Sequence, residues 1–197
     1  MKCEAHTDLI ELKAILPIAS NQEITASYLD DHTELFDERQ KILYQYWGFQ
    51  CRCEQCLLPK SLQLASDVHL RRYRLIRDRY IGDDNAENWQ IFGFRDCWSK
   101  IRQAIGLLGK EERWTEVADC WESLFHVGVG WGERSEAIEA GRSWAAELAK
   151  TGDHMSDTER QCIEKPEDLE AWGSLIEPEE DEVSTDTSLR TDSSDCA

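Results

Sequence analysis

Apolar and polar residues alternate over residues 9–15, and a period of two residues is typical of a β-strand with one solvent-facing side. A second stretch that favours a strand spans residues 23–28. Between them lie Pro17 and Asn21, and asparagine tolerates the left-handed backbone conformation that tight turns often require. The pattern therefore predicts two short strands joined by a turn, a unit that is marginal in water on its own.

After these strands the apolar residues recur every three or four positions, which is the spacing of amphipathic helices. Thr33 is the predicted N-cap of a helix that runs to Trp47, because Asp37 and Glu38 lie early in it. Four further helices are predicted over residues 66–82, 88–108, 111–127 and 134–150. The last two form a hairpin of the size used in tetratricopeptide-like repeats, but no 34-residue period supports an array. A helical bundle packed on the N-terminal unit is the alternative, and either way the fold class is mainly α.

Composition narrows the classes of partner. The 197 residues include 40 acidic and 22 basic side chains, and the net charge of −18 disfavours nucleic acid and anionic membrane surfaces as partners. No apolar run has the length of a membrane span and the N-terminus has no signal pattern, so we expect an intracellular protein, nuclear or cytoplasmic. Residues 177–197 hold eight acidic residues and one arginine, a composition that predicts a disordered acidic tail.

Three of the eight cysteines form a candidate metal site. Cys51, Cys53 and Cys56 follow one another at the spacing C-x-C-x-x-C, directly after Trp47-Gly48-Phe49-Gln50. Zinc takes four tetrahedral ligands and suits cysteine thiolates, so one tight loop would supply three of the four. A disulfide or three packed thiols are the alternatives, although a disulfide inside so short a loop would be strained. For the fourth ligand the possibilities are Cys3, His6, a water molecule or none.

The order of these features resembles the end of a SET domain followed by its post-SET zinc loop. The resemblance rests on Glu23-Ile24-Thr25-Ala26-Ser27-Tyr28-Leu29-Asp30, on Glu38-Arg39 in the next helix, and on Trp47-Gly48-Phe49-Gln50-Cys51-Arg52-Cys53-Glu54-Gln55-Cys56. The helices that follow resemble the C-terminal region of SET and MYND-type proteins. SET proteins are protein-lysine methyltransferases, so the resemblance implies S-adenosylmethionine as cofactor, zinc as a bound metal, and a protein substrate.

The resemblance also implies roles for individual residues. Tyr28 would be the catalytic tyrosine, with its hydroxyl where the cofactor methyl group meets the substrate lysine, and it would also contact the cofactor. Phe49 would match the aromatic residue that covers the cofactor, and the three cysteines would match the zinc ligands. The alternative for Tyr28 is a half-buried tyrosine that ends a strand and packs on the next helix.

Two departures from the family pattern affect the expected function. The turn before the second strand reads Asn21-Gln22-Glu23 where the family usually has Gly-Glu-Glu, and nothing matches the glycine-rich cofactor strand or the Asn-His-Ser-Cys-x-Pro-Asn segment. We therefore expect the C-terminal part of a SET domain (1–46), a zinc loop (47–60), a helical region (61–176) and a tail (177–197), inactive as an isolated methyltransferase. The alternative is a non-catalytic, zinc-stabilised acidic module that binds a basic peptide such as a histone tail.

Overall fold

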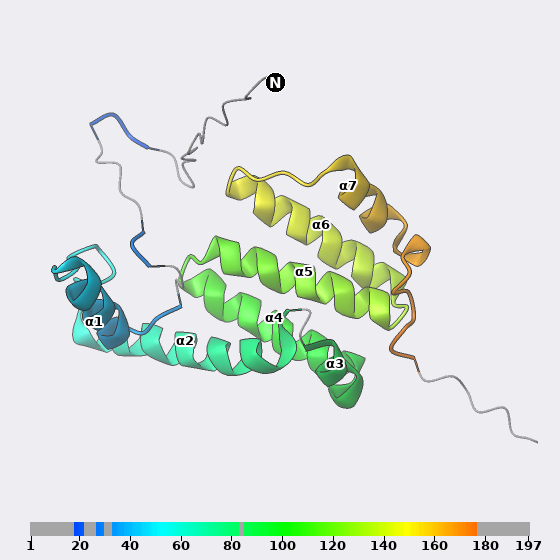
Figure 1. Cartoon of the computed structure of the whole chain (residues 1–197), viewed down its shortest axis with the longest axis horizontal. Coiled ribbons are helices and arrows are strands. Elements are labelled where there is room, and N and C mark those ends of the chain that lie inside the picture. The colour runs from blue at the N-terminus through cyan, green and yellow to red at the C-terminus, as the bar shows by residue number, and fades with distance from the viewer. Residues whose placement is uncertain (1–17, 22–26, 30–32, 83–84, 177–197) are drawn as a thin grey trace, which may run out of the picture.

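The computed structural model describes residues 18–21, 27–29, 33–82 and 85–176. This part of the chain contains α-helices, the 3-10 helix η2 (Pro166–Asp168) and no β-strand, so the prediction of a mainly α fold is confirmed. The elements, shown in Figure 1, are α1 (Phe36–Trp47), α2 (Lys60–Tyr80), α3 (Ala86–Phe92), α4 (Phe94–Lys110), α5 (Trp114–Gly130), α6 (Arg134–Lys150), α7 (Asp157–Glu164) and the 3-10 helix η2 (Pro166–Asp168).

The two predicted strands fall almost entirely outside the described residues. Of residues 9–15 none is described, and of residues 23–28 only Ser27 and Tyr28 are, neither of them in a strand. The turn between them is partly described, and Asn21 has a φ of 65°, as predicted from the tolerance of asparagine for this conformation. The predicted acidic tail, 177–197, also lies outside the described residues.

The prediction of Thr33 as a helix N-cap is wrong, because α1 begins at Phe36 with Leu35 at the capping position. The Thr33 side chain is buried and its hydroxyl accepts a hydrogen bond from Arg77 Nη1 at 3.2 Å. Two carboxylates satisfy the first N–H groups instead. The Glu38 carboxylate accepts from the Leu35 N–H at 2.9 Å, and Asp67 Oδ1 of α2 accepts from the Phe36 N–H at 2.9 Å.

Several helix boundaries downstream differ from the prediction; α5, for example, starts and ends three residues later than predicted. α2 starts at Lys60 behind Pro59, six residues before the predicted start. The apolar residues at its beginning, Leu62 and Leu64, are about half exposed and lie off the buried face that marks the rest of the helix. The single helix predicted over 88–108 is two helices, α3 and α4. The break is at Gly93, whose φ of 78° and extended ψ leave the helical conformation at little cost for a residue without a Cβ.

A 20-residue repeat organises α4, α5 and α6. Each helix has 17 residues, and they begin at positions 94, 114 and 134. Each ends in a Schellman turn, with hydrogen bonds from Arg113 N–H, Glu133 N–H and Asp153 N–H to carbonyls five residues earlier. The residue before each of these donors has positive φ, namely Glu112 (54°), Gly132 (67°) and Gly152 (79°). A search for a 34-residue period misses this pattern because the unit is one helix and one turn.

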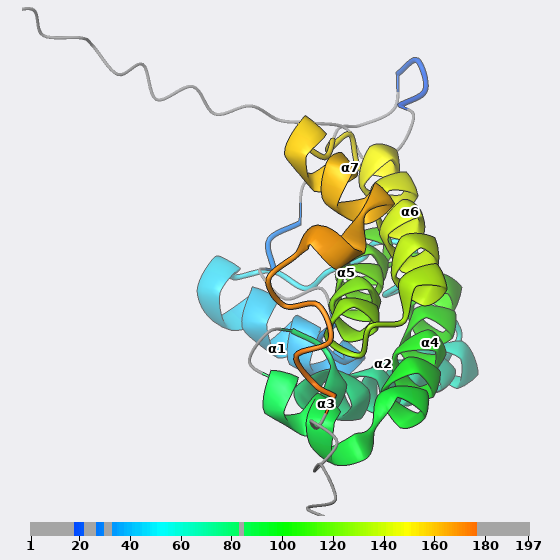
Figure 2. The same ribbon diagram turned by 90° about the vertical axis from the view of Figure 1, so that its right-hand side faces the viewer.

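The repeated turns place consecutive helices side by side. Helix α5 packs between α4 and α6, α2 packs on the other side of α4, and α7 lies against α6 (Figures 1 and 2). The closest approach is between α5 and α6, where a Cβ built on Gly128 would lie 2.9 Å from the backbone Cα and N of Ala137. Among the fully or almost fully buried side chains are Leu70, Ile101, Leu108, Leu124, Val127 and Ala140.

The segment after η2 crosses the end of α5 and satisfies its carbonyl groups. Gly173 N–H donates to the Val129 carbonyl at 2.9 Å, and Leu175 N–H donates to the Gly130 carbonyl at 2.8 Å. Leu175 also covers Gly130, where an added Cβ would approach its side chain to 2.7 Å. The last described residues therefore lie beside α3 and the C-terminal ends of α2 and α5 (Figures 1 and 2). In the described part of the chain, no helix combines the length and apolarity needed to span a bilayer.

Candidate metal centre

The loop between α1 and α2 brings the three candidate cysteine ligands together. Gly48, with a φ of 73°, ends α1, and Pro59 starts α2, so residues 49–58 fold back as a tight loop. The Sγ atoms of Cys51, Cys53 and Cys56 all lie within 4.8 Å of one another, and all three are free thiols. Tetrahedral zinc with sulfur ligands at 2.3 Å needs sulfur atoms ~3.8 Å apart. The donor set therefore fits zinc after a small contraction of the loop.

Two glutamine side chains hold the loop from the flanking helices. The Gln40 amide of α1 makes two hydrogen bonds with the backbone of Cys51, accepting from its N–H and donating to its carbonyl, both at 3.1 Å. Gln63 Nε2 of α2 donates to the Cys56 carbonyl at 2.9 Å. The first and last cysteines are thus fixed through their backbone, which leaves their sulfur atoms available to a metal ion.

A buried carboxylate from the helical region holds the middle of the loop. Glu111 follows α4, and its side chain is 8% exposed. Its Oε2 accepts from Ser66 Oγ at 2.5 Å and from Gln55 Nε2 at 3.3 Å, and its Oε1 lies 2.7 Å from His69 Nδ1. On the other side, Arg113 Nη2 donates to Gln55 Oε1 at 3.4 Å. Gln55, between the second and third cysteines, therefore links the loop to the turn between α4 and α5.

A cavity of about 160 Å³ adjoins the three cysteines. Two arginines line it, namely Arg39, which is 7% exposed, and Arg113, whose buried Nε has no hydrogen-bond partner among the described residues. A zinc ion with three or four thiolate ligands carries a net negative charge, and nearby guanidinium groups favour that charge. The remaining lining residues are Ser27, Leu29, Leu43 and Gln55.

The thiols of Cys53 and Cys56 have pKa values shifted in opposite directions. Burial acts to raise the pKa of Cys53, but hydrogen bonds from the backbone N–H of Cys56 and from the thiols of Cys51 and Cys56 outweigh it and hold this pKa below its usual value. Burial raises the pKa of Cys56 to about 12, and the neighbouring Cys53 adds to the shift. Near neutral pH the Cys56 thiolate therefore needs a bound cation to form, as is usual for structural zinc sites.

The two predicted catalytic-site aromatics lie next to each other at the loop. The ring of Tyr28 contacts those of Phe49 and Trp47 edge-on, with centroid distances of 5.5 and 5.1 Å. Tyr28 is 57% exposed and Phe49 36% exposed, so this aromatic cluster lies at the surface. Tyr28 and Phe49 do not line the cavity beside the cysteines, although the neighbours of Tyr28, Ser27 and Leu29, do.

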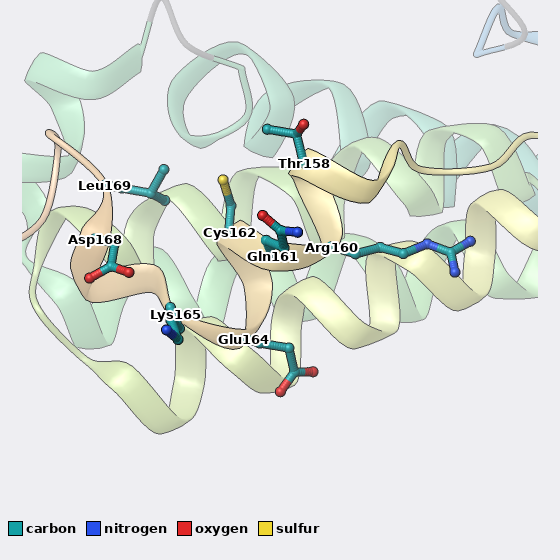
Figure 3. A pocket seen from close by; sticks show the side chains of 8 residues that line it. All are labelled: Thr158, Arg160, Gln161, Cys162, Glu164, Lys165, Asp168 and Leu169. Atoms are coloured by element: carbon teal, nitrogen blue, oxygen red, sulfur yellow. The ribbon is translucent and has the colours of Figure 1, made fainter.

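A second cavity, of about 480 Å³, lies along α7 and η2. Side chains of both charges surround it, including Arg160, Lys165, Glu164 and Asp168 (Figure 3). Glu164 is also paired with Arg142 of α6 at 3.0 Å. None of the residues predicted from the sequence to form a site lies here, and the mixed, open lining favours no particular ligand charge.

Sequence reasoning identified the three cysteines but missed the groups that hold them. Cys51, Cys53 and Cys56 are brought together as predicted, whereas the proposed fourth ligands Cys3 and His6 lie outside the described residues. The missed groups are Arg39, Gln40, Gln55, Gln63, Glu111 and Arg113. Gln55 and Arg39 lie inside the stretches on which the SET resemblance rests, Gln55 in the cysteine motif and Arg39 in the helix before it. The other contacts depend on how the helices pack.

Comparison with known proteins gives one distant relative. The protein described as histone-lysine N-methyltransferase set5 of Schizosaccharomyces pombe (strain 972 / ATCC 24843) is 36% identical to this chain over 69 residues. The match covers 34% of this chain and 21% of the relative, so it spans about a fifth of that protein's length. No family model matches the chain, and no solved structure matches it. The chain therefore has a distant and partial similarity to a SET-domain histone methyltransferase.

Proposed function

We propose that this chain carries the C-terminal part of a SET-domain protein-lysine N-methyltransferase, with Tyr28 in its catalytic site and a structural zinc site in the loop after α1. One observation carries the proposal: Tyr28 contacts Phe49, and Phe49 is the first residue of the loop in which Cys51, Cys53 and Cys56 converge. These are the residues that the SET and post-SET resemblance singles out. The partial similarity to set5 supports the same assignment.

In this proposal the metal has a structural role. A bound zinc ion would cross-link the loop and fix the direction in which Phe49 projects. Cys51, Cys53 and Cys56 would hold it as thiolates, while Gln40 and Gln63 keep their backbones in place and Arg39 and Arg113 offset the negative charge. The fourth position stays unassigned: Cys3, His6, a water molecule and no ligand at all are the alternatives, and Cys3 and His6 lie outside the described residues.

The proposed role of Tyr28 is positioning. Its hydroxyl would orient the amine of a substrate lysine, and Phe49 would wall the same channel and cover S-adenosylmethionine. The described residues do not by themselves fit that cofactor. The cavity beside the cysteines has a volume of about 160 Å³, below the roughly 300 Å³ at which small-molecule pockets usually begin. Neither it nor the cavity on α7 includes Tyr28 or Phe49. We therefore expect little methyl transfer from the 197-residue chain alone.

The finer features of the fold belong to the same proposal. We propose that residues 1–46 are a remnant of a SET core with its β-strands, that 47–60 form the post-SET loop, and that 61–176 are a tetratricopeptide-like helical region. The three helix-and-turn units of α4, α5 and α6 support the last assignment, since such regions are built from stacked antiparallel helices.

Metal analysis with matched cysteine variants tests the proposal. We expect one zinc per chain in the purified protein, lost in Cys53→Ser and retained in Cys162→Ser, a half-buried thiol of α7 outside the loop. In the same preparation, titration with S-adenosylmethionine should detect no tight binding. Absence of zinc, or equal loss in both variants, would contradict the zinc site. Tight cofactor binding, or methyl transfer that Tyr28→Phe abolishes and Tyr46→Phe spares, would contradict the expected inactivity of the chain.

A second candidate function is binding of a basic peptide, such as a histone tail, without catalysis. Two observations favour it: the net charge of −18 and the exposed aromatic cluster of Tyr28, Trp47 and Phe49, which offers ring faces to a lysine or arginine side chain. Binding of histone-tail peptides should weaken as salt rises and should be reduced in Trp47→Ala. Binding that ignores both salt and Trp47 would count against it.

A further inference from the structure

One face of α2 is apolar and basic, and within the described part of the chain it is largely exposed. Leu64, Val68, Arg72, Leu75 and Arg79 recur at intervals of three or four residues, so they form one stripe along the helix. Leu64, Val68 and Leu75 are 52%, 58% and 68% exposed. The opposite side of α2 carries Leu70, Tyr73, Ile76 and Tyr80, which are buried against the rest of the protein. We call the exposed set the α2 stripe.

The α2 stripe is basic in a protein that is otherwise strongly acidic. Helix α2 holds six basic and two acidic side chains, while the whole chain has 22 basic and 40 acidic ones. Two of the other arginines of α2 are paired, Arg74 with Glu38 and Arg77 with Asp78. For Arg72 and Arg79 the described residues provide no ion pair or hydrogen bond. Exposed apolar side chains flanked by unpaired arginines are suited to an acidic partner with a few apolar residues.

We propose that the α2 stripe is the docking site of this chain's own acidic segment, residues 177–197. The segment carries eight acidic residues and a single arginine, and it includes the apolar residues Val183 and Leu189. It is thus complementary to the stripe in charge and also offers apolar contacts.

The place where the segment begins and its length both permit this contact. The last described residues lie beside α3, which packs on α2 (Figures 1 and 2). Twenty-one residues reach up to ~70 Å when extended, and α2, also of 21 residues, is only ~32 Å long.

Because residues 177–197 are covalently joined to the helical region, even a weak attraction to the α2 stripe is enough to keep them docked for a substantial fraction of the time. A short flexible linker produces an effective concentration in the millimolar range, so a millimolar intrinsic affinity already fills the site about half of the time. The contact is mainly electrostatic, and salt therefore weakens it as the Debye length falls from ~10 Å at 0.1 M to ~3 Å at 1 M. An acidic partner protein would have to displace the segment to reach α2.

Nuclear magnetic resonance of the full 197-residue chain tests the proposal. The variant is Arg72→Gln with Arg79→Gln, and the matched control is Arg95→Gln with Arg160→Gln, which removes the same charge from exposed positions on α4 and α7. Glutamine is about as good a helix former as arginine, so both variants should fold. At low salt we expect the α2 variant to lower the docking equilibrium constant of residues 177–197 about fivefold, so that a segment docked about half of the time becomes docked about one sixth of the time. The readout is movement of the amide signals of 177–197 towards their high-salt positions, with no such movement in the control.

Three outcomes would overturn the proposal. The amide signals of 177–197 could be the same at low and high salt, or the two variants could shift them equally. Signals that change with protein concentration would show that a second copy, and not the same chain, occupies the stripe. None of these outcomes bears on the zinc site or on the methyltransferase assignment, because the α2 stripe includes no residue of either.

Discussion

Glu111 offers the sharpest test of how the helical region supports the metal loop. Its carboxylate is 8% exposed and lies within hydrogen-bond distance of Ser66 Oγ, Gln55 Nε2 and His69 Nδ1. Glu111→Gln keeps the size of the side chain but replaces one acceptor oxygen with an NH₂ group. That group either takes the place of the oxygen that accepts from Ser66 and Gln55, or faces His69 Nδ1, which can accept from it only in the tautomer with the proton on Nε2. In both orientations the network loses its charge-assisted hydrogen bonds.

The size of the effect can be estimated from these contacts. Hydrogen bonds to a charged group contribute about 1.5–3 kcal/mol each, and Gln55 shares the carboxylate with two other residues. Of these three hydrogen-bond contributions, only that of Gln55 acts directly on the loop that holds the cysteines. Loss of a residue that supports metal ligands typically lowers metal affinity 10–100-fold, which corresponds to about 1.4–2.8 kcal/mol. We expect zinc affinity in Glu111→Gln to fall within that range.

A chelator competition titration with zinc measures this affinity, and the cobalt-substituted protein gives a second readout through its thiolate-to-metal absorption. Glu112→Gln is the matched control, because Glu112 is the next residue and is exposed. Zinc affinity in Glu111→Gln within twofold of the unmodified chain, together with a lower Tm, would refute the reasoning and leave Glu111 a purely structural residue. If the unmodified chain binds no zinc, the metal site itself is wrong.

Three other predictions concern stability. Gly128→Ala should destabilise the protein by about 1–3 kcal/mol, because its Cβ would lie 2.9 Å from the backbone of α6. Gly106→Ala in α4 is the control: its Cβ meets nothing within 4 Å, and the change should stabilise the protein by about 0.5–1 kcal/mol. Urea denaturation measures both, and changes in unfolding free energy of the same sign would contradict the close approach of α5 and α6. Glu112→Gly should raise stability by about 0.5–1 kcal/mol in the same assay, because Glu112 has a φ of 54° in a turn that favours glycine, and a loss would be inconsistent with that conformation. The hydrogen bond from Arg74 holds the pKa of Glu38 below its usual 4.5, so the Glu38–Arg74 pair stabilises the fold fully above pH 4.5 and this stabilisation is lost as pH falls through the folded-state pKa. The pair is partly exposed and contributes at most about 1 kcal/mol. Between pH 6 and 3, Tm should therefore fall less in Glu38→Gln than in the unmodified chain.

Helix content and the metal loop were predictable because their signals are local. The C-x-C-x-x-C motif spans six residues, so one tight loop suffices to bring the sulfur atoms of Cys51, Cys53 and Cys56 within 4.8 Å. Predicted and observed bounds agree for α6, at 134–150, since Gly132 and Gly152 mark the turns on both sides of it. For α5 the predicted start was three residues early. The turn before α5 has Glu112 at the position with positive φ (54°), where glycine is usual, so the sequence shows no glycine there to mark the turn.

The contacts that support the loop were not predictable, because each joins residues far apart in the sequence. Thr33 has the side chain of a good N-cap, but Asp67, 31 residues beyond the start of α1, supplies the capping carboxylate once α2 packs against it. Glu111 is 56 residues from Gln55 and is one of many glutamates in an acidic chain.

The sequence alone determined which residues can bind a metal and which segments are helical, since ligand type, short spacing and apolar period act over a few residues. Tertiary structure decided which of 40 acidic side chains is buried beside the loop, and which basic helix face stays uncovered. The physical reason is that burial and desolvation depend on what packs alongside a residue. A carboxylate such as that of Glu111 is an ordinary solvated charge until α2 and the α4–α5 turn enclose it.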